Sequence, residues 1–166
     1  MPMYHALGEL PPKRHIQFRA PDGQLYTEEV FGLEGFDGNE SILYHRHSPC
    51  RISRAFPHER VVLEEWLPEE HAHRHFKLKD FPVGGDPVRS RQPLMFNNDV
   101  VIWYVRPTEA MTTYYRNGQG DEIIFVHEGE GTIRTMFGPM RYRSGDYIVI
   151  PRGTIYQIVA DEGSAQ

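Results

Sequence analysis

The chain has 166 residues, of which 39% are hydrophobic and 12% aromatic, so it is long and apolar enough for one globular domain and is not intrinsically disordered. Its formal net charge of −5 gives no general attraction to nucleic acid or to an anionic membrane, and its apolar runs are far shorter than the ~20 residues that span a bilayer. The N-terminus lacks the apolar core of a signal peptide, and the single cysteine, Cys50, excludes an internal disulfide. A cytoplasmic location is therefore predicted.

Residues 1–20 are expected to form an extended arm, because Pro2, Pro11 and Pro12 interrupt them and they include a basic cluster. Four apolar side chains would hold this arm against the rest of the protein: Tyr4, Leu7, Ile16 and Phe18. The basic cluster Lys13-Arg14-His15 is interpreted as a solvated surface, with contact to a neighbouring subunit as the alternative. A turn at Pro21-Asp22-Gly23 then leads into a predicted strand at Leu25–Phe31.

The middle of the chain alternates strand candidates with polar loops. Ser41–Tyr44 and Val61–Leu67 are predicted strands, and Arg51–Phe56 is a weaker candidate for which a helix stays open. Residues 68–93 are polar, rich in proline and contain a glycine pair, which predicts a long surface loop. Val100–Val105 follows a turn and is a strongly apolar strand candidate.

The stretch from Gly118 to Val159 organises the predicted fold. Its apolar segments are short, rich in Ile, Val, Phe and Tyr, and bounded by glycine-containing turns, which favours strands over helices. These segments are Ile123–Val126, Tyr147–Ile150 and Ile155–Val159. Short strands at such close spacing are typical of an antiparallel sandwich or barrel. We therefore predict a single, mainly β domain over residues 21–166, with its barrel core at residues 98–160.

The glycine and proline positions of this stretch resemble the two motifs of the cupin family, which forms a small jelly-roll barrel. The first motif has the form G(x5)HxH(x3–4)E(x6)G, and the second has the form G(x5)PxG(x2)H(x3)N. Glu122 stands seven residues before Gly129, and Gly145 stands six before Pro151, as the motifs require. The resemblance implies a cupin-like jelly roll, in which the glutamate and three histidines hold a metal.

The histidines of the cupin metal site are replaced in this chain. The first-motif histidine positions fall on one of two pairs, according to the spacing chosen: Arg116 and Gly118, or Tyr115 and Asn117. The second-motif histidine falls on Tyr156, and the last position of that motif is Ala160. Because Glu122 alone of the four ligands survives, we expect a barrel that keeps its fold and binds no metal.

Histidine clusters elsewhere are the other candidate metal ligands. Alternate histidines, which an extended strand places on one face, occur twice: His45 and His47, and His71, His73 and His75. Neither cluster is followed by the carboxylate and glycine of the cupin motif, and the second lies among cationic side chains. A solvated or interface loop is therefore favoured, with a metal site at His71, His73 and His75 as the alternative. His127 is interpreted as a surface or packing residue at the end of a strand.

Charged residues of the organising stretch are given structural roles. Glu122 is expected to hydrogen-bond a backbone group or to pair with Arg116. Asp121 should point away from Glu122, because neighbouring residues on a strand face opposite sides. Arg141 and Arg143 share a face and are expected on a solvated rim, with anion binding as the alternative.

Beyond these motifs, the chain resembles the N-terminal portion of the homogentisate 1,2-dioxygenase family, particularly its bacterial members. The resemblance runs from about residue 3 to residue 160 and includes loops as well as strands. It is carried by Met3-Tyr4-His5 and four longer segments: LGELPPKRHIQFR, LYTEEVFGLEGFDGNESILYHRHSP, NNDVVIWYV and YYRNGQGDEIIFVHEGEGTIRTMFGPMRYRSGDYIVIPRGTIYQI.

This resemblance implies an Fe(II)-dependent oxidoreductase of tyrosine and phenylalanine catabolism. Such enzymes open the ring of homogentisate with O₂ to give maleylacetoacetate, and they assemble as trimers and hexamers. In the family, two histidines and a glutamate hold the iron and lie in the C-terminal half, which this chain stops short of. The resemblance therefore places no catalytic, cofactor-binding or metal-binding residue here and implies no cofactor for this chain alone. The barrel is also expected to lack closing strands at its C-terminal end, which leaves an exposed edge.

Three functions stay open from the sequence. The first is the N-terminal, structural and subunit-contact part of a homogentisate 1,2-dioxygenase. The second is a free-standing, metal-free cupin with an apolar pocket for a small ligand near Tyr156 and Arg116. The third is a single-cupin metalloenzyme whose ligands are the imidazoles of His71, His73 and His75, which would have to converge on one point.

Overall fold

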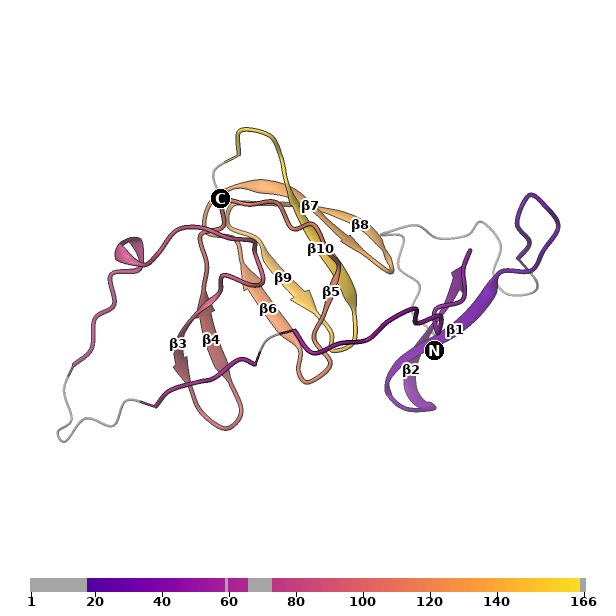
Figure 1. Cartoon of the computed structure of the whole chain (residues 1–166), viewed down its shortest axis with the longest axis horizontal. Coiled ribbons are helices and arrows are strands. Elements are labelled where there is room, and N and C mark those ends of the chain that lie inside the picture. The colour runs from indigo at the N-terminus through magenta and orange to yellow at the C-terminus, as the bar shows by residue number, and fades with distance from the viewer. Residues whose placement is uncertain (1–17, 59, 66–72, 165–166) are drawn as a thin grey trace. The chain divides into compact units, whose positions relative to one another are not determined.

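A computed structural model describes residues 18–58, 60–65 and 73–164 (Figure 1). These residues form two compact units, one made of the described parts of 1–54 and 112–165 and the other of those of 55–111. Both units are built from antiparallel strands, and among the described residues the only helical element is a short 3₁₀ turn at Leu78–Asp80. The predicted mainly β class is confirmed, while the predicted arm and single domain stay predictions. No helix in the described part of the chain is long and apolar enough to cross a membrane.

The first unit begins with a hairpin of β1 (Thr27–Glu34) and β2 (Asp37–His45). Both strands are longer than the predicted Leu25–Phe31 and Ser41–Tyr44, because the ladder continues almost to the connecting turn. Gly35 in this turn and Gly38 near the start of β2 adopt positive φ angles of 70° and 76°, which glycine tolerates without steric cost. The ring of Phe18 packs edge-on against Tyr44, with ring centroids 4.5 Å apart, so the described end of the predicted arm contacts the hairpin.

The organising stretch and the residues just before it supply the other six strands of this unit. They are β5 (Tyr115–Arg116), β6 (Glu122–Phe125), β7 (Glu130–Thr135), β8 (Gly138–Arg143), β9 (Tyr147–Ile150) and β10 (Ile155–Ala160). The strands form one sheet of order β5–β10–β7–β8 and a second sheet of β6–β9 (Figure 1). All three strands predicted in this stretch are confirmed to within about a residue at each end. Over the described residues, the ladders do not close into a barrel.

The core of the first unit is formed by alternating residues from these two sheets. Its buried members are Val126, Ile133, Tyr142, Ile150 and Tyr156, with Tyr115, Ile124, Ile148 and Ile158 packed against them at partial burial. On β7 the burial alternates along the strand, as expected where one face meets a core. On β6–β9 the opposite face carries exposed apolar side chains, which are Ile123, Phe125, Tyr147 and Val149.

The second unit contains a hairpin of β3 (Gln92–Phe96) and β4 (Val101–Tyr104). The predicted strand at Val100–Val105 is confirmed, but β3 was not predicted, and its first two residues fall within the predicted surface loop at residues 68–93. The structure accommodates Pro93 opposite Trp103 beside an irregularity of the ladder. The predicted strand at Val61–Leu67 is wrong over residues 61–65, which form no strand and expose two valines, while its last two residues lie outside the described part. Arg51–Phe56 is neither strand nor helix.

Candidate functional site

Glu122 and Tyr156 are two motif positions that the fold joins by a hydrogen bond. Glu122 begins β6 and Tyr156 lies near the start of β10 in the other sheet. The Tyr156 hydroxyl donates a hydrogen bond of 2.8 Å to Oε2 of Glu122. Tyr156 is fully buried, so this bond lies next to the core. The sequence predicts a backbone group or Arg116 as the partner of Glu122. The hydrogen bond in the structure is with Tyr156, which stands at the histidine position of the second cupin motif.

Strand alternation shows which of the two motif spacings suits this fold. Tyr115 stands opposite Tyr156 in the β5–β10 ladder, and their rings meet edge-on with centroids 5.6 Å apart. Arg116 is exposed, since it projects from the opposite face of β5. Asn117 uses its side-chain oxygen to accept the backbone N–H groups of the next turn, at 2.9 and 3.2 Å. The longer spacing therefore places Tyr115 against Tyr156, whose hydroxyl bonds Glu122.

The residues of this cluster do not fit a non-haem iron centre. Such a centre is held by two imidazoles and a carboxylate with open positions for substrate and oxygen. The cluster supplies a carboxylate and two phenols, and the Tyr156 hydroxyl proton is directed at the carboxylate. Across the described ranges 18–58, 60–65 and 73–164, no group of three His, Cys, Asp or Glu side chains is arranged to hold a metal ion.

Among the histidines that the structure describes, neither predicted cluster forms a group arranged to hold a metal ion. His45 bonds through Nε2 to Oε2 of Glu29 at 2.7 Å across the β1–β2 hairpin, and His47 is exposed beyond the end of β2. In the second cluster, His71 lies outside the described residues, while His73 and His75 are exposed. His127 is exposed, as the surface interpretation requires.

The charged residues of the organising stretch are engaged in local contacts. Asp121 accepts the backbone N–H of Arg152 at 2.7 Å, whereas Glu122 accepts the Tyr156 hydroxyl, so the two carboxylates have different partners. Arg141 forms a bidentate ion pair with Asp161, with nitrogen–oxygen distances of 2.8 and 2.6 Å. This hydrogen bonding raises the pKa of Arg141 and lowers the pKa of Asp161. Burial raises the pKa of the neighbouring Tyr142 phenol.

The ion pair should be visible in the titration of Asp161. Because its pKa is lower in the folded than in the unfolded state, the pair adds stability above the ordinary pKa of an aspartate, and this stability is lost as the pH falls through the folded pKa. In an NMR titration we expect Asp161 to protonate at lower pH than in an Arg141→Gln variant. The difference should shrink in high salt, because both side chains are largely exposed. Equal midpoints in the two proteins would contradict this expectation.

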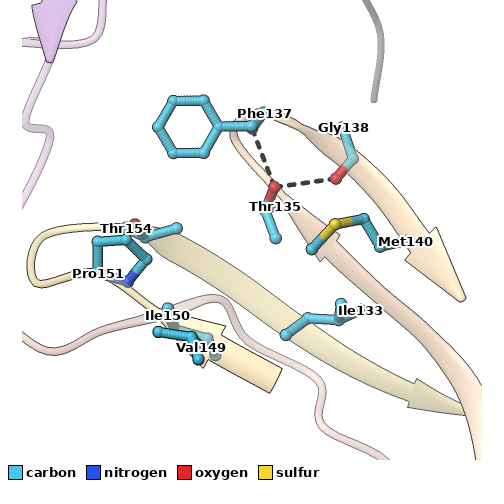
Figure 2. Close-up of a pocket in the computed structure, with 9 residues that line it drawn as sticks. All are labelled: Ile133, Thr135, Phe137, Gly138, Met140, Val149, Ile150, Pro151 and Thr154. Carbon is cyan, nitrogen blue, oxygen red and sulfur yellow. Dashed lines mark hydrogen bonds between the residues drawn. The ribbon is translucent and has the colours of Figure 1, made fainter. Parts of the chain in front are cut away.

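A mostly apolar cavity of about 190 Å³ lies beside the core (Figure 2). The turn between β7 and β8 and the residues between β9 and β10 border this partly open cavity, and its lining includes Ile133, Met140, Val149, Pro151 and the two threonines Thr135 and Thr154. Its size is comparable to that of apolar cavities that accept a benzene-sized molecule, about 150 Å³. Neither Tyr156 nor Arg116, which were expected beside a ligand pocket, lines it.

Thr154 is the one feature of this cavity that no sequence pattern indicated. Its side chain is 3% exposed, and its hydroxyl has no hydrogen-bond partner within the described structure. Thr135, on the same cavity, has a satisfied hydroxyl: it donates to the carbonyl oxygen of Gly138 at 2.9 Å and accepts the N–H of Phe137 at 3.0 Å (Figure 2). A buried hydroxyl without a partner lowers stability, whereas a satisfied one adds to it.

Thr154→Val is therefore expected to raise the free energy of unfolding by about 1 kcal/mol, because valine keeps the shape of the side chain and removes the unpaired hydroxyl. Urea denaturation monitored by circular dichroism measures the change. Thr135→Val is the matched control, and loss of its two hydrogen bonds should lower the free energy of unfolding by a similar amount. A loss of stability in both variants would show that the Thr154 hydroxyl is paired in solution.

Comparison with known proteins identifies the family. Residues 70–166 match the family model described as "Homogentisate 1,2-dioxygenase N-terminal". Over 159 residues the chain is 40% identical to a Saccharolobus solfataricus protein named "Putative dioxygenase", a match that covers 95% of this chain and 41% of that protein, so the chain spans about two fifths of the length of this curated relative. No solved structure matches the chain significantly. Because the family model covers more than half of the sequence, the chain belongs to the homogentisate 1,2-dioxygenase N-terminal family.

Proposed function

We propose that this chain is the N-terminal, cupin-like part of a homogentisate 1,2-dioxygenase, with a structural and subunit-contact role. In this proposal the complete protein opens the ring of homogentisate with O₂ and works as a homo-oligomer in the cytoplasm. Its Fe(II) is held by residues outside this chain. Membership of the N-terminal family and the share of the dioxygenase relative that the chain spans support this proposal.

The contact between Glu122 and Tyr156 is the observation on which the proposal depends most. A cupin-like jelly roll requires the glutamate of the first motif and the ligand position of the second to meet, although they lie in different sheets here. Their hydrogen bond satisfies that requirement, which supports the cupin-like fold. Because the groups that meet are a carboxylate and a phenol, they support a fold that has lost its metal site.

A subunit-contact role is supported by the outer face of the β6–β9 sheet. Two cross-strand pairs lie on this face, Ile123 with Val149 and Phe125 with Tyr147. Ile123 is 70% exposed and Tyr147 is 71% exposed, and the rings of Phe125 and Tyr147 lie 4.8 Å apart. Contiguous exposed apolar groups of this kind are typical of surfaces that another polypeptide covers.

The first test uses the purified 166-residue chain. Incubated with Fe(II), homogentisate and O₂, it is expected to consume no oxygen, to form no maleylacetoacetate and to retain less than stoichiometric iron after desalting. Oxygen uptake, absorbance of the product and metal analysis measure these three quantities. About one iron per chain together with turnover would overturn the proposal.

The second test asks whether this chain can act as the N-terminal part of an active enzyme. In a chimera, residues 1–160 replace the matching part of the Saccharolobus solfataricus relative, and the intact relative is the control. We expect both the chimera and the intact relative to bind iron and to consume oxygen with homogentisate. A chimera that folds and binds iron but fails to turn over, beside an active control, would argue against the proposed function.

A further inference from the structure

We propose that the side chains of Tyr115, Glu122 and Tyr156 stand at the position of a cupin metal centre and link the two sheets of the first unit in place of an ion. The inference rests on the cupin-like fold proposed above, and it does not depend on any dioxygenase activity. It concerns a task that a metal centre performs besides catalysis, which is to fix strands of different sheets to one another.

The position of the cluster in the fold supports this role. Over the described residues the β6–β9 sheet and the β5–β10–β7–β8 sheet share no hydrogen-bonded ladder. Glu122 belongs to the first sheet, whereas Tyr115 and Tyr156 belong to the second. The bond between Tyr156 and Glu122 therefore joins side chains that are 34 residues apart in sequence and lie in different sheets.

The chemistry of the three groups explains how they can replace an ion. A metal in this position would join the first-motif carboxylate to the second-motif side chain through two ligand bonds. A phenol is longer than an imidazole and ends in a donor, so it reaches the carboxylate directly and needs no ion between them. Tyr115 packs edge-on against the Tyr156 ring and so restricts its orientation.

The first experiment removes the link and leaves the ring. In Tyr156→Phe, we expect hydrogen-exchange protection of the β6 and β9 amides to fall about tenfold more than that of the β7–β10 ladder. Tyr142→Phe is the matched control, because it removes a hydroxyl from the same core without touching Glu122. In this variant, any change in hydrogen-exchange protection should be the same for the two sheets. Unchanged protection of β6 and β9 in Tyr156→Phe would overturn the proposal.

The second experiment restores imidazoles at the proposed ligand positions. The double variant Tyr115→His, Tyr156→His combines two imidazoles with the native Glu122 and should bind about one Co²⁺ per chain with visible d–d absorption. The control is Arg116→His, Tyr156→His, which has the same number of histidines but places one on the exposed face of β5. The control and the unmodified chain should show no such absorption.

The outcomes separate this inference from the proposed function. Cobalt binding by the Tyr115→His, Tyr156→His variant alone supports this inference. Equal binding by this variant and its control, or no binding by a folded Tyr115→His, Tyr156→His variant, overturns it. Circular dichroism establishes folding, and if the histidine variant does not fold, the exchange experiment with Tyr156→Phe decides. A chimera that folds and binds iron but fails to turn over, beside an active control, would argue against the proposed function and leave both of these results unaffected.

Discussion

Gly131→Ala is expected to lower the free energy of unfolding by at least about 2 kcal/mol, because a methyl group has no room at this position. Gly131 is buried in β7, paired with Tyr142 of β8 on one side and with Ala160 of β10 on the other. A Cβ atom there would collide with the carbonyl oxygen of Val159 and would lie 2.6 Å from the Tyr142 hydroxyl. The carbonyl belongs to the backbone of β10, so relief would require the β7–β10 ladder to move.

Urea denaturation of the full chain measures this effect, and Gly120→Ala provides the control. Gly120 has no positive φ angle, and a Cβ atom there would meet nothing within 4 Å, so its replacement should change stability by less than about 0.5 kcal/mol. Because β10 carries Tyr156, displacement of the ladder in Gly131→Ala should also weaken the contact with Glu122. Equal stability of the two variants would show that β7 and β10 are not packed as described.

Much of the first unit could be predicted because its strands carry strong local signals. The segment Tyr147–Ile150 is predicted with the bounds that the structure has, since β-branched and aromatic residues fill it and turns flank it. The same reasoning failed at Val61–Leu67, where residues 61–65 begin with two β-branched valines but find no partner strand in the described structure. Composition indicates that a segment can form a strand, whereas pairing depends on residues far away in the sequence.

At the candidate site too, some residues could be identified from motif spacing, whereas others depend on contacts between residues far apart in the sequence. Counting along the cupin motifs identified Glu122 and Tyr156, and the structure brings them into contact. The motif spacing left two options for the other position, and only the register of β5 with β10 distinguishes Tyr115 from Arg116. The unpaired hydroxyl of Thr154 had no sequence signal at all, because threonine is ordinary in a turn and its burial follows from the packing of three strands around it.

Ile133→Ala is expected to lower the free energy of unfolding by about 3 kcal/mol, within the 2–5 kcal/mol typical of a buried isoleucine. Ile133 is 1% exposed and packs in the core cluster with Tyr142 and Tyr156, and it also lines the 190 Å³ cavity. Truncation would enlarge a cavity that already exists. Because the cost of such substitutions rises with the volume left empty, this site should fall in the middle of the range or above it.

The matched control for this prediction is Ile123→Ala, which makes the same chemical change on the exposed face of β6. Its side chain is 70% exposed, so its truncation should alter the free energy of unfolding by no more than about 0.5 kcal/mol. Chemical denaturation of both variants gives the two values directly. A loss below about 1 kcal/mol for Ile133→Ala would mean that the core between the two sheets is loosely packed, since a well-packed site cannot lose three carbon atoms at so small a cost. In that case the hydrogen bond between Glu122 and Tyr156 would carry a larger share of the contact between the sheets than packing does.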